Sequence, residues 1–161
     1  MSIFDTLRQN HALEHATVAL LKERLGQEAR LVGMATGGGF YIYGELPTEM
    51  VEEAAREGLH RLRQGEKELA VSAFCGTNMV VAGVLAGLSS LAAIRGSEGL
   101  NRVPRAILAA LVAVLLSQPL GRLAQKYLTT SSDLSALSIV AVSKMGRGTA
   151  TRHKVETTSL F

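Results

Sequence analysis

Apolar side chains recur every three or four positions from about Asp5 to Leu25, which is the spacing of one face of a helix. Gly26 follows this segment, and glycine commonly ends a helix. Ionisable residues interrupt the apolar face, and they need partners there because the face is expected to be buried. The face consists of Leu7, His11, Glu14, His15, Val18, Leu21 and Leu25, with Leu13, Ala16 and Leu20 beside it.

Shorter segments that are rich in β-branched and aromatic residues predict strands. Arg30–Ala35 and Phe40–Tyr43 flank a glycine-rich turn, so we expect them to form a hairpin. This turn is not a phosphate-binding loop, because no helix beginning with Lys-Ser or Lys-Thr follows it. Three further strands are predicted over Glu68–Ala73, Ser138–Ser143 and Thr151–Thr158.

A second amphipathic helix is predicted from Pro47 to about Gln64. Its first turn is acidic, which suits the positive end of the helix dipole. His60 falls on the polar face and is expected to be a solvated surface residue, whereas Glu52 lies at the edge of the apolar stripe and is a candidate further carboxylate. The stripe consists of Val51, Ala54, Ala55, Gly58, Leu59 and Leu62.

Two uncharged apolar runs, Met79–Ile94 and Ala106–Gly121, differ from the rest of the chain. A membrane-spanning helix needs about 20 mostly apolar residues and tolerates about 17, so both runs are near the lower limit. Gly83 and Gly87 form a G-x-x-x-G motif, which favours close packing of helices in lipid. We predict a transmembrane helical hairpin over residues 76–126. The alternative is a helical hairpin that is buried in a soluble oligomer or lies in the membrane interface.

These elements together predict an α+β fold with a small mixed sheet and two helices, interrupted by the inserted transmembrane helical hairpin. A chain of 161 residues is long enough for one domain with an inserted element. We expect residues 1–75 and 127–161 to form the α+β domain and residues 76–126 to form the insertion.

The formal net charge of +3 is unevenly distributed. Residues 1–75 carry 8 Lys and Arg against 11 Asp and Glu, a net −3, whereas residues 76–161 carry 9 against 3, a net +6. No basic run is interleaved with aromatic residues, which argues against nucleic-acid binding. The single Cys75 allows no internal disulfide and suits a reducing compartment. The N-terminus has no apolar leader, so we expect a protein of the cell inner membrane with its soluble domain in the cytoplasm.

His11, Glu14 and His15 form an H-x-x-E-H pattern on the first predicted helix. Residues i and i+4 lie on one face of a helix and residue i+3 lies beside them, so two imidazoles and a carboxylate converge on one point. In such an arrangement the two His bind zinc and the Glu activates a zinc-bound water. The alternative is a buried polar network, in which these side chains are satisfied by one another or by the backbone.

A catalytic zinc site usually has three protein ligands and an open position. Cys75 is the first candidate for the third ligand, because thiolate binds zinc well and the residue lies at the start of the first apolar run. Asn78, or a backbone N–H near Gly76, is a candidate to stabilise an oxyanion. The alternatives are a small buried residue for Cys75 and a helix cap for Asn78. His153 lies between two basic residues on the last predicted strand, where we expect a surface position, and it is a reserve ligand.

Several of these motifs resemble known families. The pattern His11-x-x-Glu14-His15 resembles the inverted zinc motif of the inverzincin peptidases, although their third ligand, a downstream Glu in a much larger domain, has no counterpart here. A site of two His and one Cys beside a Glu is similar to that of peptide deformylase, with a different order of residues. The whole chain resembles an uncharacterised bacterial family of small membrane proteins, and this resemblance implies no activity. It is carried by Asn10–Thr17, Gly37–Tyr43, Cys75–Asn78 and Lys154–Thr157.

Two classes of function follow from these patterns. The first is a membrane-anchored metal-binding protein that acts as a zinc-dependent hydrolase, a peptidase or amidase, with Glu14 as general base. The second is a noncatalytic subunit or assembly factor of a membrane complex with a structural or metal-storing His/Glu site. The expected partners are the lipid bilayer and either further copies of the chain or other subunits of a membrane complex, and nucleic acid is not expected.

Overall fold

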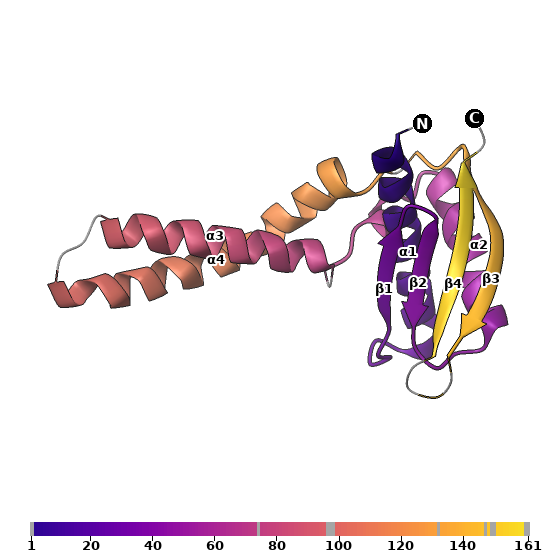
Figure 1. Cartoon of the computed structure of the whole chain (residues 1–161), viewed down its shortest axis with the longest axis horizontal. Helices are drawn as coiled ribbons and strands as arrows, with labels where there is room; N and C mark the ends of the chain where they lie inside the picture. The colour runs from indigo at the N-terminus through magenta and orange to yellow at the C-terminus, as the bar shows by residue number, and fades with distance from the viewer. Residues whose placement is uncertain are drawn as a thin grey trace. The chain divides into compact units, whose positions relative to one another are not determined.

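The structure is a computed structural model that describes residues 2–73, 75–95, 99–131, 133–146, 148 and 151–159. The chain divides into two compact units, which are both drawn in Figure 1. The first unit consists of Met1–Ser72 and Lys126–Phe161, and the second unit is Ala73–Gln125. The α+β fold predicted from the sequence is confirmed, with helices and a four-stranded sheet.

All four strands of the sheet belong to the first unit, in the order β1-β2-β4-β3. Every pairing in this order is antiparallel, where the sequence analysis expected a mixed sheet. The predicted hairpin and the last two predicted strands are confirmed. The strands are β1 (Val32–Thr36), β2 (Gly39–Tyr43), β3 (Leu137–Met145) and β4 (Arg152–Ser159).

Two amphipathic helices, α1 (Ile3–Leu25) and α2 (Thr48–Arg63), cover one face of this sheet (Figure 1). A capping box between Ser2 and Asp5 begins α1. The backbone N–H of Ser2 donates to the carboxylate of Asp5, and the hydroxyl of Ser2 accepts from the backbone N–H of Phe4. The two helices pack closely where Gly58 lies against Ala16, since a Cβ at Gly58 would stand 3.1 Å from that of Ala16.

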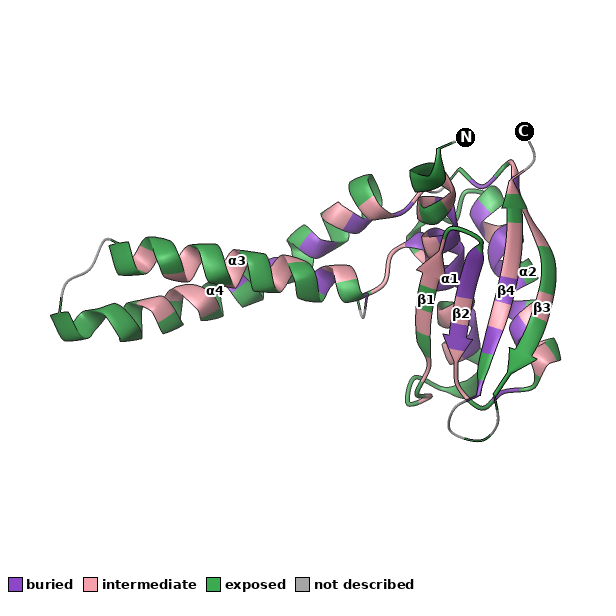
Figure 2. Cartoon of the chain, in the orientation of Figure 1, coloured by how far each residue is buried: buried purple, intermediate pink, exposed green. Residues whose placement is uncertain are grey.

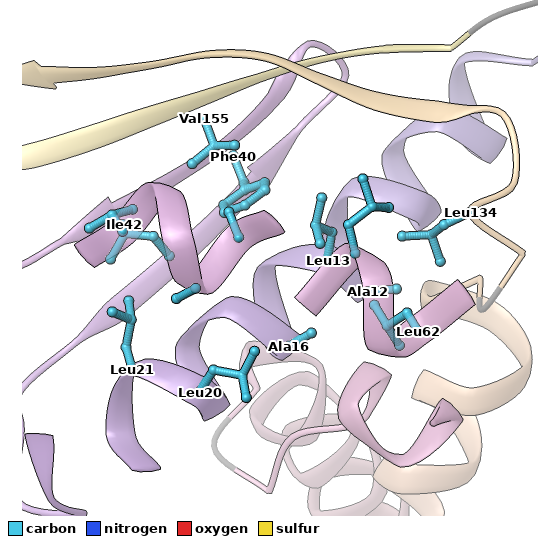
Figure 3. Close-up of a cluster of buried hydrophobic side chains, with 14 of the residues drawn as sticks. Ala12, Leu13, Ala16, Leu20, Leu21, Phe40, Ile42, Leu62, Leu134 and Val155 are labelled. Carbon is cyan, nitrogen blue, oxygen red and sulfur yellow. The ribbon is translucent and has the colours of Figure 1, made fainter. Parts of the chain in front are cut away.

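The core of the first unit lies between the two helices and the sheet, as Figure 3 shows. Phe40, Ile42 and Val155 point inward from the central strands and are fully buried. The alternation of buried and outward residues along β2 is therefore the period of two that its sequence predicts. The helices contribute Ala12, Leu13, Ala16, Leu20 and Leu21 from α1 and Val51, Ala54, Ala55, Leu59 and Leu62 from α2.

The strand predicted over Glu68–Ala73 is wrong. This segment instead forms a short 3₁₀ turn, Lys67–Ala70, which follows the end of α2. Backbone bonds from Leu69 and Val71 to residues three positions earlier close the turn. The turn contacts α1 and does not pair with the sheet.

His153 on β4 is also not where the sequence analysis placed it. Its side chain is fully buried, because β4 lies between β2 and β3 and residue 153 faces the helices. Burial lowers the pKa of His153, and the positive charge of Lys144 lowers the pKa further. Glu49 and the backbone of Leu46 raise it, without reversing the direction.

The second unit is a pair of helices, α3 (Gly76–Arg95) and α4 (Arg102–Ala124), that pack along each other. Two helical segments, Gly76–Arg95 and Gly99–Thr129, are long and apolar enough to span a membrane. Figure 2 shows exposed residues along both α3 and α4. The exposed side chains are large and apolar, among them Val80, Val84, Leu88, Leu108, Leu111 and Leu115.

A buried polar contact joins α3 to Gln125, the residue that follows α4. The amide of Asn78 donates to the carbonyl of Ala73 at 2.7 Å, and its Oδ1 accepts from Gln125 at 2.8 Å. Gly121 allows this approach, because a Cβ there would lie 2.1 Å from Asn78 Oδ1. Gly83 and Gly87 of the G-x-x-x-G motif do not make this contact, because a Cβ at either position would meet no atom of the described residues within 4 Å.

We expect the acid sensitivity of the first unit to depend on His153. A buried neutral His takes up a proton on unfolding once the pH falls below its ordinary pKa of 6.5. The contribution of His153 to the free energy of unfolding should therefore be fully present above that pH. Below it the free energy of unfolding should decrease by at most about 1.4 kcal/mol per pH unit. Urea unfolding of the full-length protein between pH 5 and pH 8 measures this slope.

The variant His153→Leu should lose this contribution to the slope, whereas His60→Leu should keep it, because His60 is exposed on α2. Equal slopes for the wild-type protein and His153→Leu would contradict the assignment.

Candidate metal centre

Three ionisable side chains of α1 lie together on the face that the sequence predicts to be buried. Glu14 and His15 are 6% and 4% exposed, and the side chain of His11 is 19% exposed. The ring centroids of His11 and His15 are 4.4 Å apart, with their planes tilted by 59°. One helical turn therefore places two imidazoles and a carboxylate side by side.

A backbone carbonyl orients each imidazole ring. Nδ1 of His11 lies 2.9 Å from the carbonyl oxygen of Thr129, and Nδ1 of His15 lies 2.7 Å from that of Ala70. A carbonyl only accepts, so Nδ1 carries the hydrogen and donates in both rings. In the neutral tautomer Nε2 then carries the lone pair, and this is the arrangement typical of metal-binding His.

Both Nε2 atoms face the carboxylate of Glu14. Oε2 of Glu14 lies 4.0 Å from Nε2 of His11 and 3.8 Å from Nε2 of His15. Nitrogen atoms of the two rings lie within 4.8 Å of each other. Ligand atoms around a tetrahedral zinc ion are about 3.3 Å apart, as its bond lengths of about 2.0–2.1 Å require. The two distances to Glu14 exceed this spacing by about 0.5–0.7 Å, and the distance between the ring nitrogens exceeds it by at most about 1.5 Å.

Gly33 on β1 provides the space for the Glu14 carboxylate. A Cβ at position 33 would lie 1.6 Å from Oε1 of Glu14. The carboxylate therefore rests against the strand backbone, in a position that any side chain at residue 33 would fill. The sequence analysis missed this role, and a glycine within a predicted strand was the signal for a close approach.

Two further buried polar residues of α1 were missed as well. The amide of Asn10 donates to the carbonyl of Thr36 at 2.8 Å, and its Oδ1 accepts from the hydroxyl of Thr157 at 2.6 Å. The amide of Gln9 donates to the carbonyl of Asp133 at 2.8 Å. These contacts hold α1 against β1, against β4 and against the segment before β3. The signal in the sequence was the Gln-Asn pair directly before His11.

The other candidate residues belong to other elements of the chain. Cys75 and Asn78 belong to the second unit, so their roles as third ligand and oxyanion donor stay predictions. The amide of Asn78 is engaged with Ala73, as described above. Glu52 pairs with Arg56 on the surface of α2, His60 is exposed as predicted, and His153 is buried in the core as a correction to its expected surface position.

Comparison with known proteins places the chain in a family. Residues 6–142 match the family described as "Domain of unknown function (DUF6391)". The chain belongs to this family. A relative from Picosynechococcus sp., described as an uncharacterized protein, is 37% identical over 139 residues, which cover 80% of this chain and 68% of the relative. No solved structure matches the chain. The DUF6391 match agrees with the expected uncharacterised family and carries no information on the resemblance to zinc peptidases.

We expect Gly33→Ala to destabilise the first unit, because the new methyl group overlaps the Glu14 carboxylate. Overpacking of this kind costs about 1–3 kcal/mol in the free energy of unfolding. The matched control is Gly37→Ala in the adjacent turn, where a Cβ meets nothing within 4 Å. Urea unfolding of the full-length variants measures both effects.

The double variant Glu14→Ala/Gly33→Ala tests the cause of this loss. Without the carboxylate, the cost of Gly33→Ala should largely disappear. An undiminished cost in the Glu14→Ala background would show that the overlap is not the cause.

Proposed function

We propose that this protein is a membrane-anchored metalloprotein that binds zinc through Nε2 of His11 and His15, and that it acts as a hydrolase of peptide or amide bonds. The observation that carries the proposal is the pair of imidazoles, each oriented by a carbonyl at Nδ1, with both Nε2 atoms facing one carboxylate. A His that binds a metal almost always donates its other ring N–H in this way.

The distances favour a shared ion over a simple polar network. Separations of 4.0 and 3.8 Å between Glu14 Oε2 and the two Nε2 atoms are too long for hydrogen bonds. A network in which the rings satisfied Glu14 directly would bring at least one of these pairs to about 2.7–3.0 Å. The wider spacing leaves room between the rings and the carboxylate for a metal ion or for a water bound to it.

Glu14 has two chemical roles open to it at this distance. As a third ligand it would bind the metal directly, in the His₂Glu set that some zinc hydrolases use. As a general base it would accept a proton from a metal-bound water, which attacks the carbonyl carbon, and deliver that proton to the departing amine. We propose the second role, with the Cys75 thiolate as the third ligand and Asn78 or the backbone near Gly76 available to an oxyanion.

The proposed Cys75 ligand is consistent with the chain's connectivity. Ala70, whose carbonyl orients His15, precedes Cys75 by five residues, and five extended residues span about 17 Å. The chain therefore allows the thiol to reach His15, and the substitution below tests whether it binds the metal.

A second candidate function follows from the burial of the site. Glu14 and His15 are nearly enclosed, and closed metal sites are typically structural, whereas catalytic sites keep an open position. The protein would then be a noncatalytic subunit or assembly factor of a membrane complex, in which the metal stabilises the first unit. The exposed apolar side chains of α3 and α4 would contact lipid, further copies of the chain or the helices of partner subunits.

We expect the purified full-length protein to bind zinc at one equivalent per chain, and His11→Ala or His15→Ala to weaken zinc binding by at least about 100-fold. Loss of an outer partner alone costs about 10–100-fold in affinity, so loss of a ligand costs more. Calorimetric titration together with elemental analysis measures both. His60→Ala, which removes an exposed histidine of α2, should bind as tightly as the wild-type protein.

Further substitutions separate the roles of the neighbouring groups. Glu14→Gln should keep zinc and lose about 10²–10⁴-fold in hydrolysis of a peptide library if Glu14 is the base, whereas loss of zinc would identify it as a ligand. Cys75→Ser should weaken zinc binding if Cys75 is the third ligand. A wild-type protein that binds no zinc would exclude the metalloprotein proposal, and one that binds zinc without hydrolysis would favour the noncatalytic alternative.

We further propose that the protein lies in the cell inner membrane with its first unit in the cytoplasm, which the single thiol and the two apolar helices support. Protease added to sealed spheroplasts should then leave the first unit intact, and protease added to inverted membrane vesicles should digest it. A first unit that is cleaved in spheroplasts would reverse this orientation, and a protein that stays in the soluble fraction would remove the membrane anchor.

A further inference from the structure

The two carbonyl groups that orient the imidazoles occupy special places along the chain. Ala70 lies just before Ser72, where the first stretch of the first unit ends, and Thr129 lies just after Lys126, where the second stretch begins. His15 therefore holds the segment that leads out of the first unit, and His11 holds the segment that leads back. Both attachments use Nδ1 of a ring whose Nε2 faces Glu14.

The returning segment makes further contacts with α1. The guanidinium of Arg8 donates to the carbonyls of Tyr127 at 3.2 Å and Thr130 at 3.1 Å, and the amide of Ser131 donates to the carbonyl of Arg8 at 3.1 Å. The departing segment is the 3₁₀ turn that ends at Ala70, which also contacts α1. One helix thus holds both ends of the interruption in the first unit.

We propose that metal binding at His11 and His15 is coupled to the order of these two connecting segments, so that zinc tightens both and loosening of either one releases zinc. This inference rests on the proposed zinc site and names its regulation. In the first unit the coupled elements are the turn Lys67–Ala70 and residues 126–131.

Two physical effects produce the coupling. A metal on Nε2 withdraws electron density from the ring, which strengthens the Nδ1–H donor and its bond to the carbonyl. In addition, a shared ion draws the ring nitrogens together by at most about 1.5 Å. Glu14 rests against the backbone at Gly33, so the rings rather than the carboxylate take up this movement and transmit it to Ala70 and Thr129. Thermodynamic linkage makes the effect reciprocal. If an ordered segment favours zinc binding by orienting the ring, then bound zinc favours the ordered segment by the same free energy.

Hydrogen exchange of the full-length protein in detergent tests the coupling without any measurement of activity. The reporter amides are those of Leu69 and Val71 beside Ala70 and that of Ser131 beside Thr129, all of which donate to backbone carbonyls. If these segments open only when zinc leaves, exchange should slow by up to about 100-fold at free zinc of 100 times Kd. The control amide is that of Gln64 at the end of α2, which bonds within its own helix and should change less than about twofold.

A matched pair of substitutions separates the carbonyl attachment from the metal ligand. The side-chain N–H₂ of an Asn stands near the place of Nδ1 of a His, whereas that of a Gln stands near the place of Nε2. His15→Asn should keep the bond to Ala70, lose zinc, and show the exchange of the zinc-free wild-type protein at Leu69 and Val71. His15→Gln loses the bond, so these amides should exchange about fivefold faster without zinc.

The outcomes distinguish this inference from the zinc site itself. Suppose that zinc binds to the wild-type protein but exchange at Leu69, Val71 and Ser131 changes by less than about twofold. This result would overturn the coupling and leave the metalloprotein proposal standing. A wild-type protein that binds no zinc would overturn both. Equal exchange for zinc-free His15→Asn and His15→Gln would show that the ring's bond to Ala70 does not hold the turn, which also overturns the coupling.

Discussion

Helix α1 carries polar side chains into the interior, and the rest of the first unit provides hydrogen-bond partners for most of their polar atoms. Gln9, Asn10, Glu14 and His15 are all nearly or fully buried. A buried polar group without a hydrogen bond costs about 1–3 kcal/mol, so these contacts constrain the fold as strongly as the apolar core does. The partners of Gln9, Asn10 and His15 are backbone carbonyls from segments distant in sequence, namely Asp133, Thr36 and Ala70. The partly exposed His11 bonds to the carbonyl of Thr129 in the same way. The position of α1 therefore determines where the chain must run on either side of the second unit.

Periodicity predicted the elements that bury one face against a continuous layer. The first and second helices follow a period of about 3.6, whereas the strands were predicted chiefly from their β-branched and aromatic residues. Both helices, the glycine-linked hairpin and the last two strands form. The failures have a common cause. Tertiary contacts that the local sequence does not show decide both cases. Lys67–Ala70 is a 3₁₀ turn that rests on α1, and His153 is buried although its neighbours Arg152 and Lys154 are charged. A central strand with a charged outer face buries whatever residue lies between the charges.

The candidate site was predictable only in part, because much of it is backbone. The H-x-x-E-H spacing predicted that His11, Glu14 and His15 meet on one face of a helix, and they do. The carbonyls that orient the rings come from Ala70 and Thr129, whose side chains carry no sign of this role. The sequence shows Gly33 as a glycine within a predicted strand, but it does not show that the side chain of Glu14 approaches it. Backbone partners depend on the tertiary path of the chain, which a local pattern does not contain.

Charge balance provides a reason to prefer a metal with a thiolate ligand at this site. Two imidazoles in the neutral form that binds a metal, together with one carboxylate, would carry a net charge of −1 at a site where the side chain of Glu14 is 8% exposed. A divalent cation alone would invert this to +1, and a thiolate would then bring the total to zero. Buried charge is costly unless it is compensated, so the neutral combination is the least costly of the three. On this argument the carboxylate of Glu14, held in place by the space at Gly33, sets the charge that any occupant of the site has to match.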